Sequence, residues 1–302
     1  MAKNILITGA TGLVGSQLTE LLLLKGYHVS HLGRTKGPGK VPSYVWNVDN
    51  GTIDKDAFQG VDTIIHLAGA GVADKRWTAA RKKEILDSRI NSTRLLFETL
   101  KKETHPVKSF ISASAIGLYG FTTGEEVFTE DSKPGTDFLA QVTQQWEEEV
   151  DTISSLGIRV VKMRIGIVLS DKGGALPAMA KPIRFGVGAS LGSGKQYLSW
   201  IHLDDLCAMF LKAVENETMK GAFNVVGPEW VTNQEMTKSI ARVLSNPLWL
   251  PSIPTFVMKI IIGEMAVIVT NGSKVSSGKI QETGFKFQFT ELTAALKDLL
   301  RK

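Results

Sequence analysis

The chain contains very little cysteine. Cys207 is the only cysteine among 302 residues, which excludes an internal disulfide and any cysteine-rich metal site. The five histidines show no metal-ligand spacing, so we expect no metal. A chain without disulfides fits a reducing compartment, and the apolar run that starts near the first residue leaves no room for a signal peptide. We therefore expect a cytoplasmic protein.

The chain also lacks a long uncharged apolar run. The longest apolar stretch covers residues 256–269 and contains Lys259 and Glu264. A membrane-spanning helix needs about 20 largely uncharged residues. We therefore predict a buried or dimer-facing helix at this place and no membrane partner.

No large excess of one charge is present. The net charge is +5, and hydrophobic residues make up 43% of the chain, as in a globular protein with a sizeable core. The densest basic cluster, "DKRWTAARKKEILDSR", mixes its cations with acids at helical spacing, which indicates a solvated helix face. Nucleic-acid binding would require a larger basic excess and aromatic platforms, so no nucleic-acid partner is expected.

Short apolar runs alternate with helical patterns along the first half of the chain. The runs cover residues 5–7, 27–33, 44–48, 61–69, 107–115 and 158–168, and helical patterns include residues 16–26, 92–102 and 137–147. This alternation predicts an α/β fold with a doubly wound parallel sheet, the Rossmann arrangement. We place a dinucleotide-binding domain at residues 1–170 and a smaller, mixed substrate and C-terminal region at 171–302. Residues 199–227 are expected to return and pack on the first domain.

A glycine-rich turn connects the first apolar run to the first helix. In "ILITGATGLVGSQL" the residues Gly9, Gly12 and Gly15 are spaced three apart. Such glycines allow a tight turn, the approach of a pyrophosphate and close packing of helix on strand, while the helix N-terminus offers free N–H groups. The cofactor-binding residues predicted here are Gly9, Thr11, Gly12, Leu13, Val14 and Gly15.

The second strand is not followed by the acid that NAD sites use. That acid normally binds the ribose hydroxyls, but the sequence here reads "LGRT", with Arg34 after the strand. An acid would repel the 2′-phosphate of NADP, whereas a guanidinium can bind it with two hydrogen bonds. We therefore expect NADP as cofactor. The alternative is that Arg34 is an ordinary surface residue at a strand end.

Several motifs together resemble a known superfamily. The segments "TGATGLVG", "HLAG", "SASAIGLYG", "MRIGIVLS", "SWIHLDDL" and "FNVVGPEWVTNQEM" resemble the extended short-chain dehydrogenase/reductases, which include nucleotide-sugar epimerases and dehydratases. More closely, "RWTAARKKEILDSRINSTRLL" and the ending "GFKFQFTELTAALKDLL" resemble atypical epimerase-family proteins with a C-terminal domain of unknown function. The resemblance implies further cofactor contacts at Leu67, Ala68, Gly69 and Arg164. For Arg164, a structural ion pair is the alternative.

The catalytic pair of that superfamily is missing. Its members use a serine after the fifth strand and a Tyr and Lys four residues apart on the next helix. The resemblance aligns Ser114 with the serine, Leu139 with the tyrosine, Thr143 with the lysine and Glu147 with an acid that often follows. Leucine cannot transfer a proton, and threonine cannot supply a cation.

Three hypotheses for function follow from this departure. In the first, Tyr119 replaces the missing acid, although a tyrosine packed under a loop with its hydroxyl bonded explains it equally well. In the second, water or substrate groups handle the protons of a hydride transfer. In the third, the protein is a non-catalytic NADP(H)-binding sensor or regulator. We favour an oxidoreductase or epimerase-like enzyme, with Ser114 polarising the substrate oxygen and Tyr119 donating the proton.

A segment of the second half resembles the part that closes over the sugar nucleotide in relatives. In "RFGVGASLGSGKQYLSWIHLDDL" we expect Arg184, Gln196 and Trp200 to recognise a small, possibly nucleotide-linked substrate. The alternative is a loop with one buried tryptophan. His202 and Asp204 are expected to hold loop backbone and Asp137 to cap the helix that follows it. The helix pair of the relatives suggests a homodimer.

Overall fold

An eight-stranded sheet runs through the molecule. The computed structural model describes residues 3–37, 39, 41–122 and 124–301. The strand order is β12-β8-β6-β5-β1-β2-β3-β4, and all neighbours are parallel except β3 and β4. The strands are β1 (Asn4–Thr8), β2 (His28–Gly33), β3 (Ser43–Asn47), β4 (Thr52–Ile53), β5 (Thr63–His66), β6 (Ser109–Ala115), β8 (Arg159–Ile165) and β12 (Gly221–Val225). The predicted doubly wound α/β fold is confirmed.

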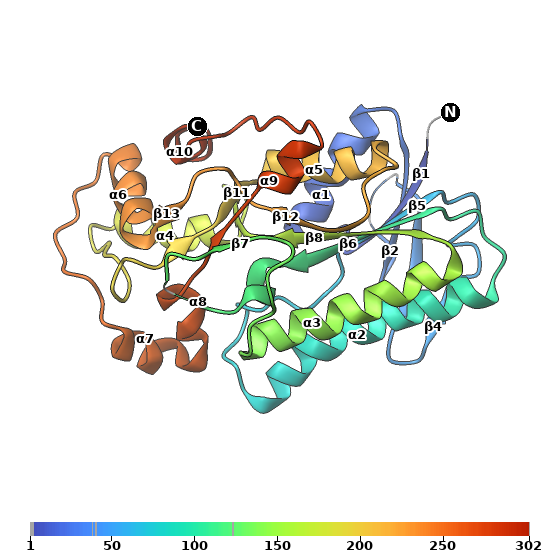
Figure 1. Cartoon of the computed structure of the whole chain (residues 1–302), viewed down its shortest axis with the longest axis horizontal. Coiled ribbons are helices and arrows are strands. Elements are labelled where there is room, and N and C mark those ends of the chain that lie inside the picture. The colour runs from blue at the N-terminus through green and yellow to red at the C-terminus, as the bar shows by residue number, and fades with distance from the viewer. Residues whose placement is uncertain (1–2, 38, 40, 123, 302) are drawn as a thin grey trace.

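Two helical layers cover the sheet (Figure 1). One layer contains α1 (Leu13–Leu24) and α5 (Leu203–Glu215), and the other contains α2 (Ala79–Lys102) and α3 (Phe138–Thr152). Because side chains alternate along a strand, Ile5 and Ile7 of β1 share a core with α1 and α5, whereas Leu6 shares a core with α2 and α3. Both faces of the sheet are therefore buried.

The chain leaves the sheet after β8 and returns to it later. β9 (Ile167–Leu169) follows β8 and pairs in parallel with β11 (Trp200–His202). The chain then forms α5, which packs against α1, and β12, which pairs with β8 at the edge of the sheet. Residues 203–225 thus supply a covering helix and an edge strand to the eight-stranded sheet.

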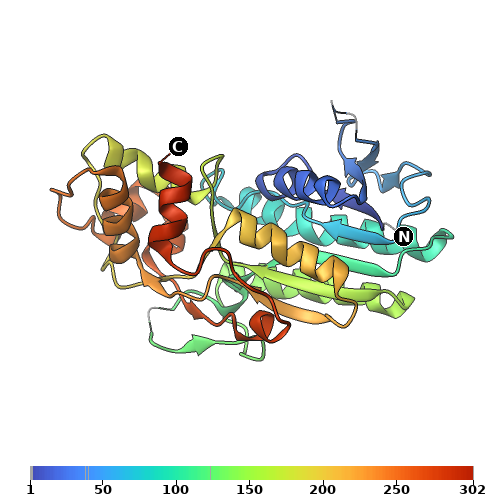
Figure 2. The same ribbon diagram turned by 90° about the horizontal axis from the view of Figure 1, so that it is seen from above.

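A second, mostly helical region lies at one end of the molecule (Figure 2). Its core is formed by α4 (Ala175–Arg184), α6 (Asn233–Leu244) and α10 (Leu292–Leu300) around buried Trp200. Short helices α7 (Thr255–Ile262) and α8 (Ala266–Thr270) complete it, with the two-residue strands β10 (Tyr197–Leu198), β13 (Val231–Thr232) and β14 (Lys274–Val275). Helix α9 (Gly278–Glu282) instead packs on β12, and the strand β7 (Val127–Phe128) lies in the loop after β6. Pairing of β7 with β14 ties this region back to the loop after β6.

The apolar stretch at residues 256–269 does not form one buried helix. It breaks at Gly263, whose φ of +66° ends α7, and α8 begins three residues later. None of the α7 side chains is buried, and Phe256 and Ile260 are 65% and 72% exposed. The buried alternative is therefore wrong for α7, and the dimer-facing alternative stays a prediction. Among the described residues, no helix is both long and apolar enough to cross a membrane.

Candidate cofactor site

The centre of the sheet contains a change of winding direction. From β1 the chain proceeds to β2 on one side, whereas β5 flanks β1 on the other side. In open α/β sheets, ligands bind outside the carboxyl ends of the strands at such a switch point. The glycine turn follows β1 and the "HLAG" segment ends β5, so both open onto this crevice.

The glycine turn brings bare backbone against the neighbouring loop. Gly9 has φ +69°, and a Cβ there would lie 2.9 Å from the Ala68 backbone nitrogen. A Cβ on Gly15 would lie 2.4 Å from the Gly9 carbonyl oxygen, so α1 can pack this closely only without a side chain. Gly12 is the N-cap of α1, and no side chain caps the helix. The free N–H groups of α1 therefore face the crevice, as a pyrophosphate requires.

A buried threonine and histidine join the two sides of the crevice. The Thr8 hydroxyl oxygen accepts the backbone N–H groups of Leu67 and Ala68, at 3.1 and 3.2 Å, and lies 2.7 Å from His66 Nδ1. With two donors already on that oxygen, the Thr8 O–H donates to Nδ1. This contact holds the end of β1 against the loop that follows β5.

The opposite nitrogen of His66 reaches α2. His66 Nε2 lies 3.3 Å from Ser92 Oγ and 3.2 Å from Thr93 Oγ1, and both hydroxyls donate to carbonyls of their own helix. Those oxygens can accept, so the proton of the neutral ring sits on Nε2. Burial, and then the charge of Arg89, lowers the pKa of His66 to about 3. The imidazole is therefore neutral at physiological pH and links β1, β5 and α2.

Arg34 lies at the exposed end of β2, on the rim of the crevice. The pKa of Glu84 on α2 is lowered first by a hydrogen bond from Arg81 and further by the charges of Lys75 and Arg34. Arg34 is thus close enough to act electrostatically on the first turns of α2. Arg34 is itself exposed.

Two arginines of the basic cluster turn inward. Arg81 is 7% exposed, donates to the Gly71 carbonyl at 2.5 Å and pairs with Glu84 at 2.7 Å. Arg89 donates to the carbonyls of Ala70 and Ile85. Burial lowers the pKa of Arg89 to about 10, which leaves it charged at neutral pH. The expectation of a wholly solvated helix face is wrong for these two side chains, because they brace the loop after β5.

Ser114, Glu147 and Arg164 form a buried network. Ser114 Oγ donates to Glu147 Oε1 at 2.5 Å, and Arg164 forms two bonds of 2.8 Å with the same carboxylate. Burial alone would raise the pKa of Glu147, but the hydrogen bonds and charge of Arg164 outweigh it and lower that pKa. Arg164 is 7% exposed and occupied by this ion pair. The geometry therefore corrects the expectation that Arg164 reaches the cofactor.

Tyr119 belongs to the same network. It ends the short helix η1 (Ile116–Tyr119) and is 2% exposed. Its hydroxyl donates to Asn224 Oδ1 at 2.6 Å and accepts from Arg164 Nη1 at 2.9 Å. Burial raises the pKa of Tyr119, and the charge of Arg164 offsets this effect only in part. Because this hydroxyl is buried and bonded on both sides, the geometry argues against Tyr119 as the proton donor.

The first turns of α3 present an apolar wall. Leu139 packs in a cluster with Trp77, Phe138 and Met265, and the Thr143 hydroxyl donates to the Leu139 carbonyl at 2.8 Å. Both side chains lie next to Gly117, at the carboxyl end of β6. Asp137 caps α3 as predicted, since it accepts from the Ala140 backbone at 3.0 Å. This wall carries no acid where the superfamily places its tyrosine.

The three residues predicted to bind substrate do not lie at one site. Gln196 is fully buried and donates to the carbonyls of Leu191 and Val269, and Trp200 is fully buried in the second region. Neither can contact a substrate in this conformation, so the geometry corrects both expectations. Arg184 is exposed and lines a pocket of about 340 Å³ with Asp171, Lys181 and Phe185. His202 Nδ1 accepts from the Asp204 backbone at 3.1 Å and caps α5.

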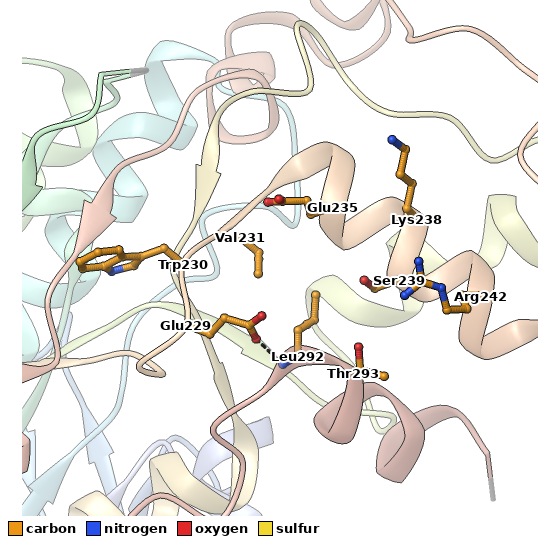
Figure 3. A pocket seen from close by; sticks show the side chains of 9 residues that line it. All are labelled: Glu229, Trp230, Val231, Glu235, Lys238, Ser239, Arg242, Leu292 and Thr293. Atoms are coloured by element: carbon orange, nitrogen blue, oxygen red, sulfur yellow. Dashed lines mark hydrogen bonds between the residues drawn. The ribbon is translucent and has the colours of Figure 1, made fainter.

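Another pocket lies between α6 and α10, away from the glycine turn. Figure 3 shows Ser239 and Arg242 on α6 opposite Leu292 and Thr293 at the start of α10. The pocket has a volume of about 260 Å³ and is also lined by Glu229, Trp230, Val231, Glu235 and Lys238. Sequence reasoning missed it, although the one-turn spacing of Lys238 and Arg242 was visible. In the described part of the chain, no cluster of His, Cys, Asp and Glu could hold a metal.

Each of the two parts of the chain matches a family model. Residues 5–227 match the NAD dependent epimerase/dehydratase family. The chain belongs to this family. Residues 253–299 match a domain of unknown function, DUF1731. The resemblance inferred from the motifs is thereby confirmed for both parts.

Relatives match over nearly the full chain. The epimerase family protein YfhF of Bacillus subtilis is 39% identical over 98% of both chains. The crystal structure of the human epimerase family protein SDR39U1 with NADPH is 30% identical, with a TM-score of 0.88 over 99% of both chains. The crystal structure of a nucleoside-diphosphate sugar epimerase from Corynebacterium glutamicum is 31% identical, with a TM-score of 0.81. The match covers 99% of the present chain and 58% of the longer Corynebacterium chain.

The close packing at Gly15 predicts a steric effect of substitution. Gly15→Ala places a methyl group 2.4 Å from the Gly9 carbonyl oxygen, so the turn or α1 must move. We expect a loss of about 1–3 kcal/mol in the free energy of unfolding, measured by urea denaturation. Gly124→Ala is the control, because the atom nearest to its Cβ would be 3.9 Å away. Equal stability of the two variants would contradict the close approach.

The neutral state of His66 predicts a pH dependence. The unfolded chain binds a proton at His66 below about pH 6.5, whereas the folded chain does so only near pH 3. Stability from this residue is therefore complete above pH 6.5 and declines as the pH falls toward 3. In His66→Gln we expect a smaller slope of unfolding free energy against pH in this window, although the variant is less stable at pH 7. Surface His28→Gln should keep the wild-type slope, and an unchanged slope in His66→Gln would refute the assignment.

Proposed function

We propose that the chain is an NADP(H)-dependent oxidoreductase or epimerase-like enzyme acting on a small or nucleotide-linked carbonyl or hydroxyl compound. The observation that carries the proposal is the bare glycine turn at the start of α1, with the exposed Arg34 directly after β2. The positions of Gly9 and Gly15 leave no space for a Cβ, and α1 starts without a side-chain cap. A pyrophosphate fits such a cradle, and the bound nicotinamide would supply or accept the hydride.

Different residues of the site would bind different parts of the cofactor. In this proposal the main chain of Gly9, Thr11, Gly12, Leu13, Val14 and Gly15 holds the pyrophosphate. Arg34 binds the 2′-phosphate, and Leu67, Ala68 and Gly69 line the crevice on the β5 side. The presence of NADPH in the human relative's crystal structure supports the choice of NADP. The Corynebacterium relative, a nucleoside-diphosphate sugar epimerase, supports a nucleotide-linked substrate.

Proton transfer must proceed without an acid from α3. Leu139 cannot donate, and the hydroxyl of Tyr119 is committed to Asn224. Ser114 remains the polar group at the carboxyl end of β6, and its hydroxyl would have to turn from Glu147 to polarise a substrate oxygen. In this proposal Ser114 makes that rotation, and water or the substrate itself supplies the proton.

A second function is favoured by the same network. Ser114 and Tyr119 both donate their hydroxyls to internal acceptors, Glu147 and Asn224. With these two hydroxyls bonded internally, the site suits a sensor that binds the dinucleotide and transmits its bound state to a partner. This non-catalytic alternative predicts cofactor binding without turnover.

The cofactor choice can be tested at Arg34. Since hydrogen bonds to charged groups contribute about 1.5–3 kcal/mol, Arg34→Ala should weaken NADPH binding by about 10- to 100-fold. Binding of NADH should change little. Dissociation constants from fluorescence titration measure both, with Arg242→Ala as a control at an exposed arginine remote from the turn. If wild-type protein binds NADH more tightly than NADPH, or if Arg34→Ala leaves the ratio unchanged, the NADP assignment is wrong.

Turnover separates the two functions. We expect NADPH oxidation with at least one member of a panel of carbonyl compounds and nucleotide-linked keto sugars. Ser114→Ala should lower kcat about 100-fold while the Kd for NADPH stays constant, because one donor to the reacting oxygen is lost. Ser239→Ala, in the remote pocket, is the matched control. Binding without oxidation across the panel would favour the sensor, and unchanged kcat in Ser114→Ala would remove Ser114 from the chemistry.

A further inference from the structure

Exposed apolar side chains gather on the second region. Among the described residues, eleven large hydrophobic side chains are exposed, and seven of them fall within residues 185–187 and 249–261. Of these seven side chains, the most exposed are Trp249 at 77%, Phe185 at 74% and Ile260 at 72%. The other members are Val187, Leu250, Phe256 and Ile261. Large exposed apolar patches mark interaction sites, whereas scattered residues do not.

The two segments that carry these side chains lie side by side. Ile253 exchanges backbone hydrogen bonds of 2.8 Å with Ser190 and Gly192. The Asn246 side-chain amide donates to the Ile183 carbonyl at 2.9 Å. Figures 1 and 2 both place the segment between α6 and α7 at the end of the molecule remote from the N-terminus. We call residues 181–195 and 245–262 the end surface.

The end surface is basic. It contains Lys181, Arg184, Lys195 and Lys259, all exposed, and no Asp or Glu. Acids are absent from all of residues 172–203 and 236–263. Of the acids that border these stretches, Glu264 pairs with Lys82, and Asp171 lines the pocket with Lys181 and Arg184.

We propose that the end surface docks on the surface of a membrane that contains anionic lipid. Helix α7 places Phe256 and Ile260 one turn apart, with Lys259 beside them, and none of its side chains is buried in the protein. Exposed aromatic and aliphatic groups flanked by cations enter the interface between headgroups and acyl chains, where the cations meet anionic headgroups. Such a helix lies in the membrane plane, so it needs no spanning segment. This departs from the sequence-based expectation of no membrane partner, which considered only a span.

Charge distinguishes this occupant from a second copy of the chain. Two end surfaces placed face to face would bring Lys181, Arg184, Lys195 and Lys259 of one copy near the same cations of the other. No acid of the end surface could pair with them. A bilayer that carries negative headgroups has the complementary charge, and a neutral bilayer does not.

Vesicle sedimentation of the full chain tests the proposal. We expect binding to vesicles of phosphatidylcholine with about one third phosphatidylglycerol, weakening as salt is raised, and little binding to phosphatidylcholine alone. The double variant Phe256→Ser and Ile260→Ser should weaken binding about 10- to 100-fold, because two apolar side chains lose their burial. The matched control is Leu23→Ser with Leu24→Ser, which removes exposed leucines from α1.

The charge contribution needs its own variant. Lys195→Glu with Lys259→Glu should weaken binding at least about 20-fold, since each basic residue near the surface contributes about fivefold. Lys25→Glu with Lys55→Glu changes the net charge equally at exposed sites elsewhere and should retain most of the binding. Circular dichroism melting of each variant verifies the fold.

Three results would overturn the proposal. The first is no sedimentation of wild-type protein with the anionic vesicles. The second is equal loss in the end-surface variants and their controls, which would indicate unspecific attraction. The third is a dimer in analytical ultracentrifugation that Phe256→Ser with Ile260→Ser converts to monomer, which would assign the surface to a second copy. None of these results bears on NADPH binding, so the proposed function is tested separately.

Discussion

The contact between Thr8 and His66 holds together the crevice at the carboxyl ends of β1 and β5. The threonine oxygen accepts two backbone N–H groups from the loop after β5 and donates to the imidazole, which reaches α2 with its other nitrogen. Three elements from different parts of the chain are thereby fixed around one neutral ring. The bare turn at Gly9 packs against the same loop, so the shape of the cradle depends on this arrangement. Loss of the contact would remove the hydrogen bonds that join the two sides of the crevice.

The buried network around Glu147 shows how this corner of the candidate site differs from the pattern of the wider superfamily. Where a tyrosine and a lysine would face the nicotinamide, Leu139 packs into an apolar cluster and Thr143 bonds its own helix. The polar groups have instead turned into the core, where Arg164 neutralises Glu147 and positions Tyr119. A buried ion pair of this kind fixes geometry more reliably than it adds stability. The fold has kept the position of the serine but not the free acid beside it.

The features that were predictable from the sequence are the local ones. The glycine turn, the helix after it and the Asp137 cap each depend on residues within a few positions of one another, and the apolar runs revealed the strands. The orientations of Ser114, Tyr119 and Gln196 depend on partners far along the chain: Glu147 lies 33 residues from Ser114, Asn224 lies 105 from Tyr119, and Val269 lies 73 from Gln196. Hydrophobic periodicity contains no information on such pairings. It also could not show that Phe256, Ile260 and Ile261 of α7 are exposed, whereas Ile262 packs against a core cluster.

The path of the chain through β9, β11, α5 and β12 makes the two parts interdependent. The polypeptide passes through the helical end before it supplies the last strand and one covering helix of the eight-stranded sheet. A fragment ending at residue 170 would expose the β8 edge and the α1 side of the sheet to solvent. The boundary between the parts is therefore not a place where evolution or a protease could divide the protein into modules. The helical end and the crevice are joined by β9, β11, α5 and β12, so neither part can be removed without exposing the other.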